Sequence, residues 1–326
     1  MTTIKDVAKH ARVSVTSASY ALNGNGTISD ETRRRVLRSA EELNYHPNAF
    51  ARNLKHRNTL TIGVFITRFA GSFYEEILEG IHQVILQTDY ELIVIPETHG
   101  KRRILSHRQV DGAIVFDVKV PNETLLKLAS QKFPIVVLDR DLENEWVHPL
   151  LIDNRGGAAA AFEHLYGQGM RRIAFVSGPM DSYDSRERMK AFLAEGDRAG
   201  LEIPCYPGNF TEVSGYEAAL AVFAAGELPE AVFCANDQMA IGFLKAMNER
   251  ALAAPGDIAV VGFDDILVSR LVRPALSTIG ASRTGWGALA ATQLIEFLVN
   301  GRPFQPSRIP VQLIARESSL KNGRAG

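Results

Sequence analysis

From Leu60 onward, short and continuously apolar runs alternate with longer stretches of helical periodicity, and this alternation limits the fold more than any other feature. Strands that are apolar at every position are typical of parallel sheets covered on both faces. They are predicted at Leu60–Ile66, Leu92–Ile95, Ala113–Phe116, Pro134–Leu138, Arg172–Ser177, Ala231–Cys234 and Ile258–Val261. The covering helices are predicted at Tyr74–Gln87, Glu123–Gln131, Gly156–Gln168, Arg186–Ala199, Gly215–Ala225 and Gln238–Arg250. We therefore expect a doubly wound α/β protein, and more than 260 residues of this pattern favour two similar lobes.

The first 58 residues differ from the rest of the chain in charge. They hold ten Lys and Arg against five Asp and Glu, whereas the remainder holds 26 basic and 32 acidic residues. A basic segment on an acidic body indicates that the segment meets a polyanion and that the body does not.

The same basic segment has the pattern of three short helices. Ile4, Val7 and Ala8 have the spacing of one buried helical face, and a break at Arg12–Ser14 precedes a second helix, Val15–Leu22, capped by Ser14. A third helix is predicted from about Ser29 to Leu43. The second helix is short and rich in hydroxyl side chains, which suits contact with a DNA major groove. We expect a helix-turn-helix, with a purely structural helical domain as the alternative.

Four sequence motifs in the head resemble one known family. They are Thr3-Ile4-Lys5-Asp6-Val7-Ala8, Val13-Ser14, Ala21-Leu22-Asn23 and Leu43-Asn44-Tyr45-His46-Pro47-Asn48-Ala49. Together they resemble the head of the LacI/GalR family of bacterial transcription regulators, and the body resembles that family's ligand-binding core, which is itself similar to periplasmic sugar-binding proteins. The resemblance implies a homodimer that places two recognition helices in successive major grooves of a pseudo-palindromic operator in double-stranded DNA.

The resemblance also implies a division of the chain. It places a helix-turn-helix domain at 1–45, a hinge helix or linker at 46–59 and a two-lobed core at 60–326. One lobe comprises about 60–151 plus 281–310, and the other about 152–280 plus 311–320. The segment Thr98–Gln109 departs from the family because it is shortened and basic.

By the same resemblance, particular residues contact DNA. Val15, Thr16 and Tyr20 match base-reading positions, and Leu54 matches a wedge that opens a base step in the minor groove. The positions that match mainly phosphate contacts or the hinge are Ser14, Ser19, Asn23, Thr32 and Asn48. Most members have Arg where this chain has Tyr20, so we expect a half-site that differs from the common one.

In the body, polar side chains follow the predicted strands, at the edge where doubly wound sheets bind ligands. Asp139, Asn236 and Asp264 each come directly after such a strand, and Arg188 lies in a following helix. These groups suit the hydroxyls of a polyol, and the rings of Phe73 and Phe210 suit its apolar face. By resemblance all six match effector-contact positions.

A structural role remains an alternative for each of the six residues. Asn236 or the adjacent Asp237 suits a helix cap, and Arg188 lies in a charged run typical of a solvated face. The pair Asp264-Asp265 suits a turn, and the two phenylalanines suit the core.

Other functional classes fit the sequence less well. We find no glycine-rich dinucleotide or P-loop motif, no nucleophile-elbow motif and no metal-ligand spacing among the histidines, so we expect neither an enzyme nor a cofactor. No run approaches the length of a membrane span and no signal peptide is recognised, so we expect a cytoplasmic protein without membrane contact rather than an exported sugar-binding protein. The short segment after Glu317 lacks a leucine repeat, which favours a dimer over a tetramer.

We therefore expect a transcriptional repressor whose operator affinity is controlled by a small molecule, with a sugar as the first choice. A purine-type corepressor and a partner protein remain alternative controlling ligands.

Overall fold

The computed structural model describes residues 2–22, 28–45, 58–67, 69, 72–96, 104–105 and 109–320. Two compact units make up the chain, Met1–Thr59 and Leu60–Gly326. Of the shortened segment at 98–109, only residues 104–105 and 109 are described. In the described ranges no helix has the length and apolarity needed to cross a membrane.

The first unit is a small helical domain whose described helices are α1 (Ile4–His10), α2 (Val15–Leu22) and α3 (Asp30–Glu42). Arg12, between α1 and α2, has a φ of 52°, which turns the chain sharply. The amide of Ser17 donates to Ser14 Oγ over 3.0 Å, so Ser14 caps α2 as the sequence predicts. Small side chains, among them Ala8, Ala18 and Ala40, fill the core and let the helices approach closely. The predicted helix-turn-helix is confirmed.

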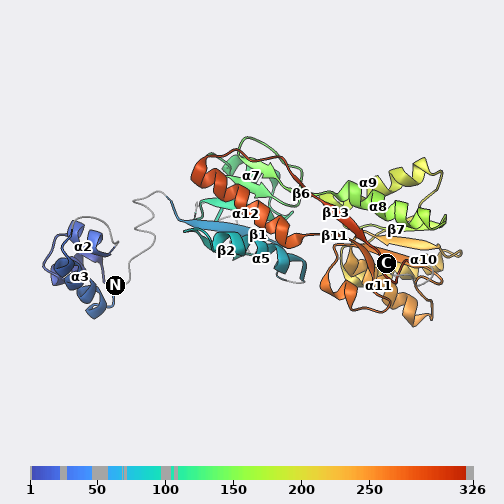
Figure 1. Ribbon diagram of the computed structural model, residues 1–326, viewed down its shortest axis with the longest axis horizontal. Coiled ribbons are helices and arrows are strands. Elements are labelled where there is room, and N and C mark those ends of the chain that lie inside the picture. Colours follow the sequence, from blue (N-terminus) through green and yellow to red (C-terminus); the bar gives the residue numbers. More distant parts are fainter. Residues whose placement is uncertain are drawn as a thin grey trace. The chain divides into compact units, whose positions relative to one another are not determined.

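Among its described residues, the second unit contains two large sheets, one in each lobe (Figure 1), and a third sheet of only two short strands. The N-lobe sheet has the order β2-β1-β3-β4-β5, and all its pairs are parallel. Its strands are β1 (Thr61–Ile66), β2 (Glu91–Ile95), β3 (Gly112–Phe116), β4 (Ile135–Val137) and β5 (Val147–Pro149). Helices α5 (Ser72–Ile85) and α12 (Arg283–Asn300) pack on one face, and α7 (Asn122–Leu128) packs on the other.

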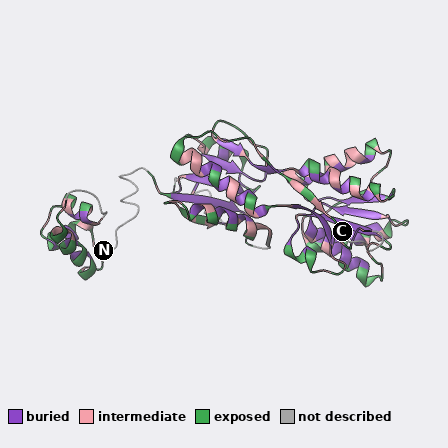
Figure 2. Cartoon of the chain, viewed as in Figure 1, coloured by how far each residue is buried: buried purple, intermediate pink, exposed green. Residues whose placement is uncertain are grey.

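The C-lobe sheet has the order β13-β11-β10-β9-β7-β8 and is parallel except for the antiparallel pair of β11 with β13. Its strands are β7 (Ile173–Val176), β8 (Cys205–Tyr206), β9 (Ala231–Cys234), β10 (Ala259–Phe263), β11 (Ser277–Ala281) and β13 (Val311–Ile314). Its helices are α8 (Asn154–Gly167), α9 (Tyr183–Arg198), α10 (Glu212–Ala224) and α11 (Asp237–Glu249), together with the short 3-10 helix η1 (Leu267–Arg270). Figure 2 shows that the central strands of both sheets are buried, as their apolar sequences predict.

The chain passes between the lobes at sites far apart in the sequence. It leaves the N-lobe through β6 (Leu151–Ile152), returns between β11 and α12, and crosses again between β12 (Arg308–Ile309) and β13. Strands β6 and β12 pair in parallel, which ties two of these crossings together.

The predicted two-lobed α/β fold is confirmed, but several elements were absent from the prediction. Strands β6, β8 and β12 have two residues each and leave no periodic signal. Strand β11 begins with Ser277 and Thr278, which are fully buried yet polar, so it lacks the apolar run used to find the others. Helix α12 contains Gly285 and Gly287, which weaken the helical pattern in the sequence.

Candidate DNA-binding surface and ligand cavity

Helix α2 presents a polar and exposed face in the helical unit. Val15 and Tyr20 are 43% and 41% exposed, and Thr16 is exposed beside them. Ala18 and Ala21 bury the opposite face against the rest of the unit. The three residues predicted to read bases therefore lie on the accessible side of one helix.

The residues predicted to contact phosphate are placed less uniformly. Ser14 is exposed at the N-terminus of α2, whereas Ser19 and Thr32 are half-buried. Thr32 Oγ1 accepts a hydrogen bond from Ser29 Oγ over 3.0 Å, near the N-terminus of α3. Asn23, Asn48 and Leu54 lie outside the described residues.

A cavity of about 770 Å³ in the second unit is lined by residues of both lobes. The residues predicted to contact a ligand all line it, namely Phe73, Asp139, Arg188, Phe210, Asn236 and Asp264. They come from different elements, but each follows a strand: β1, β4, β7, β8, β9 and β10. Because the strands of each sheet run mainly parallel, their carboxyl ends lie at one edge and bring these side chains together.

Arg188, on α9, is held in position by groups of the C-lobe and is only 3% exposed. Its Nε donates to Asn154 Oδ1 over 2.8 Å, and its Nη1 donates to the carbonyl oxygen of Ala235 over 2.6 Å. Its guanidinium carbon lies 3.6 Å from the centre of the Phe263 ring. The alternative of a solvated face is therefore wrong for Arg188, which is a fixed cation in the cavity wall.

Asp264 supplies a buried carboxylate next to Arg188. Its Oδ1 lies 3.5 Å from Arg188 Nη1, and among the described residues this buried oxygen has no hydrogen-bond partner. Burial raises the pKa of Asp264 to about 6, even though the charges of Arg188 and Arg283 lower it. This oxygen, which has an ion pair but no hydrogen bond, is suited to accept a hydrogen bond from a ligand hydroxyl or amine.

Asp139 is buried in the N-lobe wall and is paired with its neighbour in sequence. Arg140 donates to it from Nε over 2.8 Å and from Nη2 over 3.0 Å. Burial raises the pKa of Asp139, while the Arg140 hydrogen bond lowers it. A ligand would therefore meet an already paired carboxylate.

Asn236 has two structural contacts in addition to its place in the cavity wall. Its Oδ1 accepts from the amide of Met239 over 3.0 Å, which caps α11, and its Nδ2 donates to the carbonyl oxygen of Phe210 over 3.2 Å. The helix-cap alternative thus describes part of its role, and the second bond helps to place Phe210. Asp237 is fully buried and accepts hydrogen bonds from Ile266 and Ser269, so it anchors the loop after β10 rather than the ligand.

The two phenylalanines are positioned by aromatic and glycine neighbours. Phe73 contacts Tyr74 and Phe116, with ring centres 5.5 and 5.6 Å apart. Phe210 packs on Gly178, where a β-carbon would lie 2.3 Å from the ring. Both rings are partly buried and border the cavity, so each combines core packing with an accessible edge.

The prediction missed several residues of the cavity wall and its support. Asp184 lines the cavity, is half-buried and accepts from Asn154 Nδ2 over 2.7 Å; desolvation raises its pKa. It lies four residues before Arg188, a spacing that places both on one side of α9 and was available as a signal. Arg140 follows Asp139 directly. Asn154 and Arg283 had no signal, because only the tertiary fold brings them to the site.

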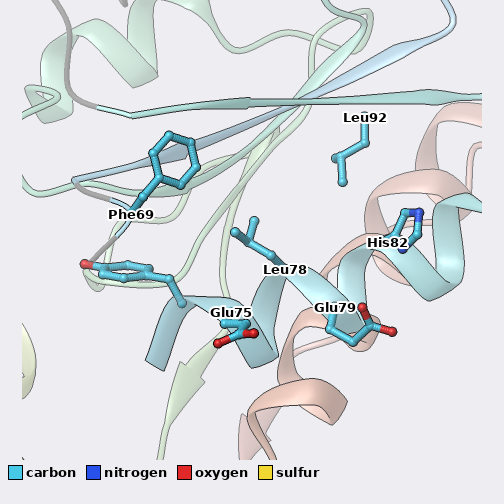
Figure 3. Close-up of a pocket in the computed structure, with 7 residues that line it drawn as sticks. Phe69, Glu75, Leu78, Glu79, His82 and Leu92 are labelled. Atoms are coloured by element: carbon cyan, nitrogen blue, oxygen red, sulfur yellow. The ribbon is translucent and has the colours of Figure 1, made fainter. Parts of the chain in front are cut away.

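A second hollow of about 600 Å³ lies on the N-lobe (Figure 3); no predicted site residue lines it, but Tyr74 lines both this hollow and the ligand cavity. It is lined by one side of α5, including Glu75, Leu78 and His82, together with Phe69 and Leu92. Within the described parts of the chain, no three His, Cys, Asp or Glu side chains are grouped to hold a metal ion.

Comparison with known proteins agrees with this arrangement of parts. Residues 3–48 match the family model described as bacterial regulatory proteins, lacI family, and residues 162–319 match a periplasmic binding protein-like domain. The chain is 33% identical over 306 residues to the HTH-type transcriptional repressor PurR of Pasteurella multocida (strain Pm70), which covers 91% of this chain and 92% of the relative.

Two solved structures are similar over most of their length. A lac repressor dimer bound to operator and an anti-inducer has a TM-score of 0.84 at 26% identity, covering 98% of this chain and 99% of that one. A sugar-binding transcriptional regulator from Enterococcus faecalis has a TM-score of 0.74 at 36% identity, covering 80% of this chain and 98% of that one.

Proposed function

Because this chain belongs to the lacI family of bacterial regulatory proteins, we propose that it binds its operator as a homodimer under the control of a sugar. The chain is a DNA-binding transcriptional repressor and not an enzyme. We propose further that a small ligand controls this repressor, and we propose the chemistry of that ligand and the residues that contact DNA and ligand.

The proposal of a sugar ligand is supported chiefly by the side chains that form the cavity wall. One guanidinium, one amide and carboxylates converge there with two aromatic rings. Adjacent sugar hydroxyls both donate and accept hydrogen bonds, so they can satisfy Arg188 and Asp264 together, while a ring covers the C–H face. The similar regulator from Enterococcus faecalis is named as sugar-binding, which supports this choice.

Helix α2 is the proposed reading element of the repressor. We place Val15, Thr16 and Tyr20 at base edges, with Ser14, Ser19, Asn23, Thr32 and Asn48 at the backbone and Leu54 as the minor-groove wedge. Residues 1–45 act as the reading domain, 46–59 as the hinge and 60–326 as the core. A homodimer presents two copies of α2, and the exposed Leu267, Val268 and Leu271 around η1 supply apolar surface to bury in it. A cytoplasmic location follows from operator binding.

The ligand acts by binding two arrangements of the lobes unequally, since equal affinity for both would shift nothing. Residues of both lobes line the cavity, so a bound sugar stabilises one arrangement over the other. The hinge immediately precedes β1, so a change in the N-lobes of the dimer alters the spacing of the two hinge segments.

The first experiment is selection of bound duplexes from a randomised DNA pool with excess competitor at about 0.15 M salt. We expect enrichment of a two-fold symmetric site, and its sequence reports what Tyr20 reads. Repeating the selection with pooled sugars, and separately with pooled nucleobases, identifies the controlling ligand. Enrichment of an asymmetric site would contradict the dimer, and a response to nucleobases alone would replace the sugar.

The ligand site is then tested by substitution. We expect Asp264→Ala to abolish the response of operator binding to the ligand while leaving operator affinity without ligand unchanged. Asp197→Ala, which removes an exposed carboxylate on the same lobe, is the matched control and keeps the response. A full response in the Asp264→Ala protein would remove this carboxylate from the site.

A further inference from the structure

Arg283, the first residue of α12, is a buried cation that contacts both lobes. Its Nη2 donates to Glu76 Oε1 on α5 over 2.7 Å, and the same nitrogen donates to the carbonyl oxygen of Asp265 over 3.1 Å. Glu76 belongs to the N-lobe, whereas Asp265 follows β10 in the C-lobe. One side-chain nitrogen therefore joins the two lobes.

The other two nitrogens of Arg283 are not satisfied. Both Nε and Nη1 are buried and have no hydrogen-bond partner in the part of the chain that the structure describes. Buried guanidinium donors are costly when unpaired, so these two donors favour any arrangement that gives them an acceptor. The Phe73 ring, whose centre lies 5.8 Å from the guanidinium carbon, offers only a weak electrostatic partner.

Both ends of this bridge lie close to residues that line the ligand cavity. Asp265 is the immediate neighbour of Asp264, and Glu76 lies one helical turn after Phe73. Asp265 is held firmly, since Arg270 Nη2 and Arg316 Nη2 donate to its two carboxylate oxygens over 2.6 and 2.5 Å. Asp264 and Asp265 have φ values of 115° and 48°, so the backbone at this end is strained.

We propose that Arg283 is a positioning residue that latches the two lobes together beside the ligand cavity. In the arrangement described here, Glu76 and the Asp265 carbonyl use one nitrogen of the guanidinium. Nε and Nη1 of Arg283 have no hydrogen-bond partner among the described residues, and Asp264 Oδ1 has its ion pair with Arg188. A second arrangement of the lobes can pair these groups, with each other or through a ligand. The latch therefore sets the equilibrium between the two arrangements of the lobes. Only the effect of this equilibrium on operator affinity rests on the proposed function.

The latch is tested by measuring the distance between spin labels placed on opposite lobes of the full chain. Labels go on Lys127→Cys in α7 and Asp197→Cys in α9, both exposed, in a Cys205→Ser background that removes the exposed native thiol. Excess unlabelled protein ensures that each measured pair lies within one chain. We expect Arg283→Gln to broaden the distance distribution or add a second peak, and Arg283→Lys to restore part of the original distribution.

Glu76→Gln provides a second test of the same bridge in case the Arg283 variant does not fold. The Glu76 side chain is 41% exposed, so we expect its substitution to leave the fold intact. We expect it to broaden the distribution as Arg283→Gln does, and the double variant to add nothing further, since both remove one bridge. Arg302→Gln, which breaks an exposed ion pair within the N-lobe, is the matched control and leaves the distances unchanged. Unchanged distances in both Glu76→Gln and Arg283→Gln would overturn the latch.

The coupling is tested with the operator duplex from the selection as the probe. We expect Arg283→Gln and Glu76→Gln to change operator affinity in the absence of ligand by the same factor, and Arg302→Gln to leave it unchanged. Altered lobe distances with unaltered operator affinity would overturn the coupling and leave the latch standing. Failure to select any operator would count against the proposed function without affecting the distance result.

Discussion

Two cavity residues, Phe210 and Asp264, have φ values of 67° and 115°, which non-glycine residues rarely adopt. Such backbone costs about 1–3 kcal/mol at each residue and persists only where neighbours hold it. The amide of Asp264 donates to the carbonyl oxygen of Ile279 over 2.7 Å, and the carbonyl oxygen of Phe210 accepts from Asn236. Two of the cavity side chains, Phe210 and Asp264, therefore extend from strained backbone that neighbouring groups hold in place.

Gly178 offers a test of how closely the Phe210 ring must be placed. A β-carbon there would lie 2.3 Å from the ring, so Gly178→Ala must push the ring out of position. We expect the dissociation constant of the ligand identified by the screen to rise about tenfold, or about 1.4 kcal/mol, measured by titration calorimetry.

The control for this substitution is Gly167→Ala, because a β-carbon at Gly167 would meet nothing within 4 Å. Operator affinity without ligand should stay the same in both variants. Unchanged ligand affinity in the Gly178→Ala protein would mean that the Phe210 ring is not part of the binding surface.

At the scale of elements, glycines allow pairs of helices to touch along their backbones. A β-carbon on Gly80 of α5 would lie 2.0 Å from the carbonyl oxygen of Thr284 in α12, and one on Gly287 would lie 2.0 Å from that of Ile77. Helices α10 and α11 meet in the same way through Gly215 and Gly242. Within the described residues, each lobe therefore contains a pair of helices that pack too closely to admit a side chain at the glycine positions.

Gly242→Ala should separate α10 from α11, because the new β-carbon would lie 1.9 Å from the carbonyl oxygen of Glu212. Alanine favours helix formation by roughly 1 kcal/mol over glycine, yet the overpacking works against this gain. We expect a net loss of about 1–3 kcal/mol in the free energy of unfolding, measured by urea denaturation.

Gly167→Ala again supplies the comparison, with an expected change of less than about 1 kcal/mol. If Gly242→Ala were as stable as this control, the two helices would be able to shift apart without cost, and the close contact would not contribute to the fold.

At the scale of the whole molecule, one buried carboxylate links several C-lobe elements. Asp237, the first residue of α11, accepts from Ser269 Oγ over 2.6 Å, from Thr278 Oγ1 over 2.5 Å and from the amide of Ile266 over 3.0 Å. Its pKa is raised to about 7, because burial and then the nearby charge of Asp264 raise it more than the hydrogen bonds lower it. The stability of the core therefore depends on pH through this residue.

The sign of that dependence follows from proton binding. An unfolded Asp titrates near a pKa of about 3.9, so from there to about pH 7 the folded protein binds the proton more tightly and loses stability as pH rises. We expect the unfolding free energy of the wild type to fall relative to that of Asp237→Asn between pH 5 and 7, by at most about 1.4 kcal/mol per pH unit. Urea titrations across this range measure the difference.

Comparing the two proteins removes the contribution of His148 and His164, whose pKa values burial lowers and which act in the opposite direction. Asp197→Asn, at an exposed position, should follow the wild type at every pH. A constant difference between the wild type and Asp237→Asn would show that Asp237 has the same charge in the folded and unfolded states.

Local patterns in the sequence determined the helix-turn-helix, the alternating α/β order and the place of Asp139, Asn236 and Asp264 after strands. Each of these depends on neighbours within a few residues, on apolar periodicity, caps and strand ends, so the sequence contains the whole signal. The same reasoning predicted that Asp139, Asn236 and Asp264 lie at one edge of a sheet, because parallel strands end together. That is correct for Asn236 and Asp264, which follow β9 and β10 of the C-lobe sheet, but Asp139 follows β4 of the N-lobe sheet.

Only the tertiary structure decided how those side chains are held. Arg283 and Glu76 are separated by 207 positions along the chain, and Arg188 meets Asn154 across 34. These pairs form because the chain crosses between the lobes repeatedly and brings the start of α12 against α5. A contact of this kind depends on sheet order and on the lobe arrangement, neither of which leaves a mark in the local pattern of residues.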